Sequence, residues 1–153
     1  MRFSDDYVKG QKAVEAVKMY LMDMDNANIS FRDATPEEQK DEIDLVVNDT
    51  ETCEIKVQSK PNVIAVEETS QDAKPGWIYT SKAKWLLEVS DKHILKIDMQ
   101  KLWEYYCATK HLNKLIINKG ESDGWFGDKW HSSFRYYPVT EIANYVGITK
   151  VNL

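Results

Sequence analysis

The chain has 153 residues, of which 42% are hydrophobic and 29% are charged, and its net charge is −5. This length can bury a core without disulfides or a structural metal, so we expect a single domain over residues 1–153. The acidic balance excludes a protein that coats nucleic acid by bulk positive charge, and without a long apolar run or an apolar N-terminal segment we expect a cytoplasmic protein outside the membrane.

The first third of the chain predicts one helix and two short elements. Residues 5–25 carry apolar side chains at helical spacing, with Val14, Val17 and Leu21 on one stripe. A short strand is expected around residues 29–32. Thr35 followed by Pro36 favours a brief helical turn.

From Ile43 onward the hydrophobic period changes from helical spacing to two. This alternation predicts a β-hairpin made of residues 43–47 and 53–57, joined by residues 48–50. In that register Val47 pairs with Glu51. The odd-numbered residues then form a continuous apolar face from Ile43 to Val57, which suits a core.

The remaining segments predict further strands and two helices. Asp98 can cap a helix that runs to about His111, and Pro138 and Gly147 suit the start and the end of a short final helix. The other expected elements are an extended run at 62–68, two strands around a turn at 90–92, a strand at 115–118, and a Gly-rich aromatic loop or hairpin at 120–138. This order indicates a mixed α/β architecture.

The even-numbered face of the hairpin carries the chemistry. Asp44 is expected directly opposite Glu54, with Lys56 and Gln58 beside them. Two carboxylates this close repel each other unless a proton or a cation intervenes, and their oxygens suit a hard divalent ion such as Mg²⁺, for which Mn²⁺ can substitute. A metal there could activate a water, and Lys56 could position that water or neutralise charge on phosphorus.

These residues resemble a known signature. Asp44 followed by Glu54-Ile55-Lys56 is similar to the motif of the PD-(D/E)xK nuclease superfamily, in which an Asp on one hairpin strand precedes Glu-x-Lys on the next. An acidic residue on the preceding helix is common in that family, and Glu15 occupies a suitable place. The order of these four residues resembles that of small Holliday-junction resolvases and related phage or mobile-element nucleases.

The resemblance implies a fold and a function. The fold would be a mixed central β-sheet flanked by helices, a restriction-endonuclease-like core. The activity would be Mg²⁺-dependent cleavage of DNA, by an endonuclease rather than an exonuclease, with a homodimer as a plausible assembly. The catalytic residues would be Asp44, Glu54, Lys56 and Glu15, and the metal ligands Asp44, Glu54 and the backbone carbonyl of Ile55.

Other interpretations remain open for the hairpin. Its even-numbered face could be the solvated side of an amphipathic hairpin, but carboxylates placed opposite each other are destabilising without a reason, which favours a metal site. A nuclease-fold DNA-binding or protein-binding module without catalysis, such as an accessory or inhibitor protein, is the leading alternative. An unrelated α/β domain is the third.

Several further residues are candidates for contacts with nucleic acid or metal. Gln58 lies on the face just described, and Lys129 and Arg135 are interleaved with aromatic residues between positions 120 and 137. Closure of these aromatic rings over the core is the favoured interpretation of that segment. Glu67 could supply another acid, although a surface position at a strand edge is favoured. The cysteines, Cys53 and Cys107, are expected to be buried reduced thiols.

Overall fold

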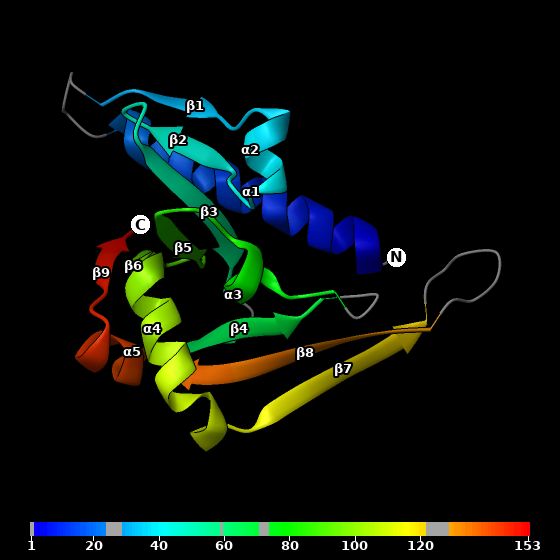
Figure 1. Cartoon of the computed structure of the whole chain (residues 1–153). Helices are drawn as coiled ribbons and strands as arrows, with labels where there is room; N and C mark the ends of the chain where they lie inside the picture. The colour runs from blue at the N-terminus through cyan, green and yellow to red at the C-terminus, as the bar shows by residue number, and fades with distance from the viewer. Residues whose placement is uncertain (1, 24–28, 59, 71–73, 122–128) are drawn as a thin grey trace.

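Two β-sheets organise the residues that the computed structural model describes, namely 2–23, 29–58, 60–70, 74–121 and 129–153 (Figure 1). The larger sheet has the order β1 (Phe31–Asp33), β2 (Leu45–Val47), β3 (Glu51–Val57), β5 (Trp85–Val89), β6 (His93–Asp98) and β9 (Thr149–Asn152). The smaller has the order β4 (Val63–Thr69), β8 (Lys129–Pro138) and β7 (Leu115–Glu121). Because β3 and β5 run parallel and their other neighbours run antiparallel, the larger sheet is mixed, and the predicted mixed α/β class is confirmed.

Helices and the smaller sheet cover the two faces of the larger sheet. The helical elements are α1 (Arg2–Asp23), α2 (Pro36–Lys40), α3 (Trp77–Thr80), α4 (Met99–Thr109), a 3-10 turn (Lys110–Leu112) and α5 (Val139–Tyr145). On one face, α1 packs through Ala13 and Val17 against Cys53 and Ile55 of β3. The odd-numbered apolar side of the hairpin therefore faces α1, as an alternating strand requires.

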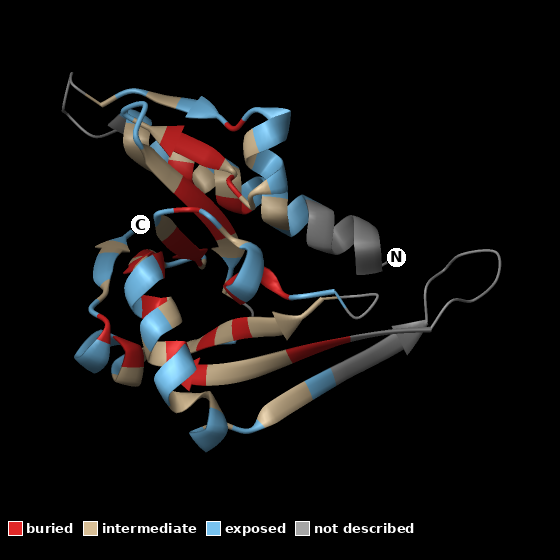
Figure 2. Cartoon of the chain, viewed as in Figure 1, coloured by how far each residue is buried: buried red, intermediate tan, exposed pale blue. Residues whose placement is uncertain are grey.

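The main core lies on the other face of the larger sheet. It joins β5 and β6 to α3, α4, α5, β4 and β8, and Figure 2 shows buried bands on several of these elements. Its most buried members include Ile64, Val66, Leu86, Ile97, Leu102, Tyr106, Tyr137 and Ile142. Even-numbered residues of β3 and β5 point toward this second layer.

The predicted hairpin is present in the expected register, but its ladder is one pair shorter than expected. Val47 pairs with Glu51 as expected, and Asn48 and Asp49 turn the chain with φ values of 51° and 62°. The ladder ends at the pair Leu45 and Cys53, and the expected direct pairing of Asp44 with Glu54 is wrong. Asp44, which directly precedes β2, instead donates its backbone N–H to the carbonyl of Cys53 over 2.8 Å.

Three other expectations need correction, namely the apolar-face positions of Ile43 and Val57 and the burial of Cys107. Ile43 packs with Val46 in a small separate cluster, since it precedes β2 and does not share the apolar face of the hairpin. Val57, at the end of β3, is 38% exposed. Cys53 is buried and Cys107 is exposed, because Cys107 lies on the outer side of α4.

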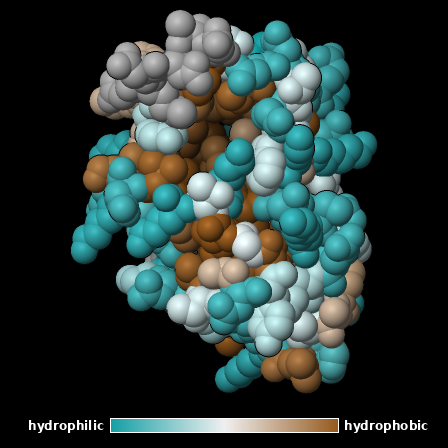
Figure 3. Space-filling view, turned by 90° about the vertical axis from the view of Figure 1, so that its left-hand side faces the viewer, coloured by the Kyte–Doolittle hydropathy of each residue, from teal (hydrophilic) through white to brown (hydrophobic). Residues whose placement is uncertain are grey.

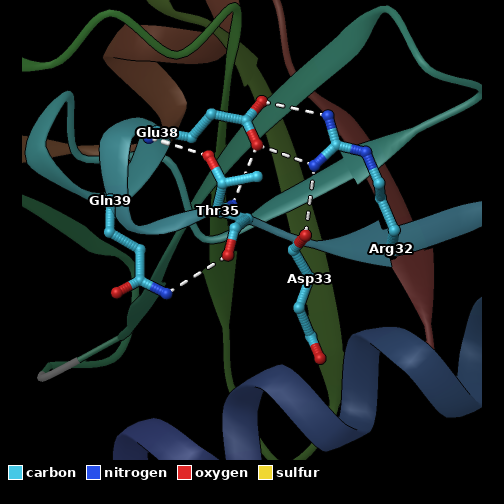
Figure 4. A network of polar contacts seen from close by, with 6 residues as sticks. Arg32, Asp33, Thr35, Glu38 and Gln39 are labelled. Carbon is cyan, nitrogen blue, oxygen red and sulfur yellow. Dashed lines mark hydrogen bonds and ion pairs between the residues drawn. The ribbon is translucent and has the colours of Figure 1, made fainter.

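Polar caps fix the ends of several helices. At α2 the Thr35 hydroxyl accepts from Glu38 N, and Thr35 N donates to the Glu38 carboxylate, a capping box (Figure 4). Arg32 donates to both oxygens of Glu38 over 2.6 and 3.1 Å, and this hydrogen bonding lowers the pKa of Glu38 to about 2. The network ties β1 to α2 just before the chain reaches Asp44.

The predicted caps of the later helices are also found. The Asp98 carboxylate accepts from Lys101 N at the start of α4. Gly147 follows α5 with φ of 88° and donates to the carbonyl of Ile142, as a glycine after a helix does. The segment 115–138 is a hairpin of β7 and β8, with residues 122–128 outside the described part.

The surface mixes apolar and polar areas. Figure 3 shows, on one side of the molecule, a hollowed apolar band bordered by hydrophilic residues. Within the described ranges, none of the helices has the length and apolar character needed to cross a bilayer.

Candidate active site

The candidate site is built on the face of β3 that points away from α1. In the parallel pairing of β3 with β5, Glu54 is level with Leu86 and Lys56 is level with Glu88. Residues level with each other on neighbouring strands project to the same side of a sheet. Glu54, Lys56 and Glu88 therefore share one face, opposite the odd-numbered residues that contact α1.

Glu54 is the most deeply buried charged residue of this face, with 1% of its surface exposed. Its Oε1 atom lies 2.9 Å from Lys56 Nζ. Among the described residues, neither carboxylate oxygen has a partner that meets both the distance and the direction of a hydrogen bond. Burial raises the pKa of Glu54, while Lys56 and the nearby Ser81 hydroxyl oppose that rise.

Lys56 supplies the positive charge that these acids share. Burial disfavours its ammonium form, yet the negative charges of Glu54, Glu42 and Glu67 raise its pKa above the ordinary value. Its side chain is 35% exposed, so it links the buried carboxylate of Glu54 to the surface. The positive charge of one amine therefore offsets the negative charge of several carboxylates.

Asp44 reaches β3 through its side chain. Its Oδ2 atom accepts a hydrogen bond from the backbone N–H of Ile55 over 2.7 Å. The backbone pairing of β2 with β3 ends at Leu45, and this side-chain hydrogen bond extends the contact between the two segments by one step. Burial raises the pKa of Asp44, and the Ile55 hydrogen bond and Lys56 oppose the rise. Because the N–H and C=O of a strand residue point toward the same neighbouring strand, the Ile55 carbonyl faces the side where Asp44 lies.

Glu88 belongs to this cluster and was missed by the sequence interpretation. Only 3% of it is exposed, and burial raises its pKa to about 8, with Lys56 opposing and Glu54 adding to the rise. A signal was available in the segment Trp85-Leu86-Leu87-Glu88-Val89, where one acid interrupts an apolar strand. Such a residue needs a polar partner in the core.

Glu67 also lies nearer to the site than expected. It is half-buried, and its carboxylate accepts the backbone N–H of Trp77 over 3.2 Å at the start of α3. Burial raises its pKa, and the charge of Lys56 opposes the rise. The favoured placement at a strand edge is found in part, since β4 is an edge strand of the smaller sheet, but the Glu67 carboxylate reaches the start of α3. We use the name acidic cluster for Asp44, Glu54, Glu67 and Glu88 around Lys56.

Glu15 is not brought to the acidic cluster. Its side chain is 67% exposed and lies 3.8 Å from Lys18 on the same helix. The reason is the placement of α1, which covers the odd-numbered face of β3 through Ala13 and Val17. Residues on α1 are therefore separated by the sheet from the side that carries Glu54, and the expected position of Glu15 beside the other acids is corrected.

The three candidate nucleic-acid contacts lie in different places. Gln58 pairs its Oε1 atom with His93 Nε2 at 3.1 Å and lines a hollow formed with α1. Arg135 is 17% exposed and binds Glu68 and the carbonyl of Asn113, so protein groups already occupy its guanidinium. Lys129 lies in β8 level with Glu121, and its side chain is outside the described part.

The donor chemistry of the cluster fits a divalent cation with few protein ligands. Within the described residues, no three His, Cys, Asp or Glu side chains are arranged to hold one ion. A smaller set of oxygen donors consists of the carboxylates of Asp44 and Glu54 and the backbone carbonyl of Ile55. Mg²⁺ commonly takes one or two carboxylates and completes its shell with water and substrate phosphate. The Glu54 carboxylate, which has its ion pair with Lys56 but no well-directed hydrogen bond within the described residues, is the feature that a cation would satisfy.

Comparisons of the chain with protein-family models, with curated proteins and with solved structures find no match in any of the three.

Proposed function

We propose that the chain is a metal-dependent nuclease that hydrolyses phosphodiester bonds in DNA, more often within a strand than at its end. The observation that carries the proposal is Glu54, a buried carboxylate without a well-directed hydrogen-bond partner in the described part of the chain, beside the part-exposed amine of Lys56. A buried carboxylate that has an ion pair but no well-directed hydrogen bond is costly unless it serves a cation or a reaction.

Asp44 and Glu54 would hold the metal together with the carbonyl of Ile55. Bound Mg²⁺ would supply a Lewis acid for the phosphoryl oxygens and lower the pKa of a coordinated water. The raised pKa values of both carboxyls support this assignment, because a nearby cation stabilises the charged form that burial disfavours. Mn²⁺ has similar oxygen affinity and would substitute.

Lys56 would act on the phosphate. Its pKa lies above the ordinary lysine value, so it stays protonated at neutral pH and serves as a cation, not as a base. Its part-exposed position allows the amine to contact a phosphate that approaches from solvent. Its contribution would be to orient the substrate and to stabilise charge that develops on phosphorus.

The fold supports the resemblance to the PD-(D/E)xK superfamily in its main lines. The mixed sheet carries helices on its faces, and Asp44 and Glu54-Ile55-Lys56 come from the two arms of one hairpin. Glu15 is left out of the proposed site, since α1 lies on the other side of the sheet. The catalytic set we propose is Asp44, Glu54 and Lys56.

The experiment is a cleavage assay with pure protein and end-labelled single-stranded and double-stranded DNA, in Mg²⁺, in Mn²⁺ and in chelator. We expect cutting in either metal, none in chelator, and a loss of at least about 100-fold in Asp44→Asn and Lys56→Met. Glu15→Gln is the matched control, because it changes an exposed acid away from the cluster. Its rate should stay within about twofold of wild type.

Two outcomes contradict this proposal. Cutting that survives Asp44→Asn unchanged would trace the activity to another site or to a contaminant. Tight DNA binding without cutting in either metal would instead favour the non-catalytic nuclease-fold module.

A further inference from the structure

A cavity of about 490 Å³ lies between α3 and α4. Its walls are α3 with the segment that follows it, residues 78–84, and the first turns of α4. The segment is fixed against the hairpin, because Lys84 N donates to the Thr52 hydroxyl over 2.9 Å, two residues before Glu54. Ser81 also lines the cavity, and its hydroxyl lowers the pKa of the Glu54 carboxyl, so this segment connects the cavity with the strand that carries Glu54.

Two aromatic rings form one side of this cavity. Tyr79 and Trp103 meet edge to face, with centroids 5.3 Å apart and an interplanar angle of 75°. The Tyr79 hydroxyl is hydrogen-bonded to that of Tyr106 over 2.9 Å, which holds the first ring in place. Tyr79 is nevertheless 43% exposed, so part of the pair remains open to a ligand.

Two lysines line the same cavity. Lys82 is 73% exposed and pairs with Asp41 at 3.2 Å, and Lys84 is 54% exposed and pairs with Glu51 at 2.9 Å. Exposed pairs of this kind contribute little to stability, so a phosphate can take the place of either carboxylate. Rigid aromatic rings beside exposed amines are the combination that binds an unpaired base and its backbone.

We propose that this cavity holds an unpaired nucleobase of the strand that the acidic cluster cuts, stacked on Trp103 with its edge toward Tyr79, and with flanking phosphates on Lys82 and Lys84. This inference rests on the proposed function. The volume of the cavity falls within the range that suits small organic ligands. A base in this position would place its own strand, and not a closed duplex, beside Glu54 and Lys56. The preferred substrate would therefore be single-stranded or locally unpaired.

The test measures binding in chelator, where no cutting is expected, by fluorescence anisotropy. The probes are labelled thymidine strands of about 12 nucleotides, the uridine equivalent in RNA, a DNA duplex, and a strand of equal length without bases. Trp103→Ala should weaken binding to the thymidine strand about tenfold or more, and Trp103→Phe should restore most of it. Tyr145→Ala is the control, since Tyr145 is 73% exposed on α5 and does not line the cavity.

The base-free strand separates stacking from phosphate contacts. Wild type should bind it about tenfold more weakly than the thymidine strand, and Trp103→Ala should cause no further loss with it. Equal losses with both strands in Trp103→Ala would overturn the proposal, as would equal binding of both by wild type. Comparison of the DNA and RNA strands shows which sugar the cavity accepts.

Failure of this inference and failure of the proposed function give different results. Base-dependent binding through Trp103, with no cutting in the metal assay, supports the cavity and overturns the nuclease. If metal-dependent cutting is lost in Asp44→Asn but Trp103→Ala binds DNA as wild type does, the proposed nuclease activity is supported and the proposed base-binding role of the cavity is overturned.

Discussion

At the scale of single residues, the site depends on the charge of Lys56. Its amine lies 2.9 Å from the carboxylate of Glu54, and its charge lowers the pKa of Asp44, Glu67 and Glu88 against the effect of burial. Removing one partner of a buried ion pair costs far more than removing an exposed pair, because it leaves a buried charge without compensation.

Lys56→Met should lower the free energy of unfolding by about 3 kcal/mol at pH 7 in chelator. The matched control is Lys82→Met, whose partner Asp41 is exposed, and its effect should stay below about 1 kcal/mol. Urea unfolding followed by circular dichroism measures both. If the two variants lose equal stability, Lys56 does not carry the charge balance of the cluster.

The burial of Glu88 predicts how the free energy of unfolding depends on pH. Its pKa in the folded protein is about 8, above the usual value of 4.5, so the folded state holds a proton that the unfolded state releases. The stability that this neutral carboxyl contributes is complete below about pH 4.5 and is lost as the pH rises to about 8. Unfolding free energies measured in chelator should therefore fall by an amount on the order of a few kcal/mol across this interval.

Glu88→Gln should remove that part of the pH dependence, because the amide does not titrate. Glu15→Gln, with an exposed acid, should keep the wild-type profile. An unchanged profile in the Glu88→Gln protein would mean that another group causes the loss of stability.

At the scale of elements, the position of α3 against β4 depends on a close backbone contact. A Cβ atom added at Gly76 would lie 2.2 Å from the carbonyl oxygen of Glu67, and backbone cannot yield as a side chain does. Gly76 N also donates to the carbonyl of Glu68 over 3.0 Å, which holds this contact together. The start of α3, which binds the Glu67 carboxylate, therefore requires glycine.

Gly76→Ala should lower the free energy of unfolding by about 2 to 3 kcal/mol. Gly10→Ala is the matched comparison. Gly10 lies on α1, and a Cβ added there would meet no atom within 4 Å apart from the neighbouring backbone of its own helix. That variant should gain about 0.5 to 1 kcal/mol from helix propensity. Thermal unfolding of both proteins measures the difference, and wild-type stability in Gly76→Ala would show that α3 can shift without cost.

The elements differ in how well the sequence predicts them. The hairpin, α2, α4 and α5 were predicted because their signals are local, such as alternation, Thr35 at a cap or Gly147 at an end. The four-residue α3 and strand β9 were missed, since packing and pairing with β6 define them. The hydrogen bond from Ile55 N to the Asp44 carboxylate was missed for the same reason, because this side chain takes the place of a backbone partner that only the fold reveals.

At the scale of the whole molecule, the arrangement of layers decides which residues meet. The sequence predicted Glu54 and Lys56 on one side of β3, and the structure places them there because strand alternation is independent of the rest of the fold. It did not predict which face α1 covers, which is why Glu15 was misplaced. Glu88 joins the cluster only through the parallel pairing of β3 with β5, two strands separated by a long insertion.

The smaller sheet is tied to α4 by a polar network instead of by the acidic cluster. Arg135 on β8 binds Glu68 on β4 over 3.2 Å, and the Tyr106 hydroxyl donates to the same carboxylate. Arg135→Leu should therefore destabilise the protein by about 2 kcal/mol through the lost ion pair. DNA affinity at 25 °C should change less than about twofold, and a large loss of affinity in a folded variant would restore Arg135 as a nucleic-acid contact.

The central claim is that Asp44 and Glu54 hold one hard cation beside Lys56. The most direct measurement is the binding of Mn²⁺ by electron paramagnetic resonance, which counts free ions in the presence of the protein. We expect one ion per chain in wild type, competition by Mg²⁺, and loss of that ion in Glu54→Gln but not in Glu15→Gln. If wild type binds no Mn²⁺, or Glu54→Gln binds it as wild type does, Asp44 and Glu54 do not form a cation site.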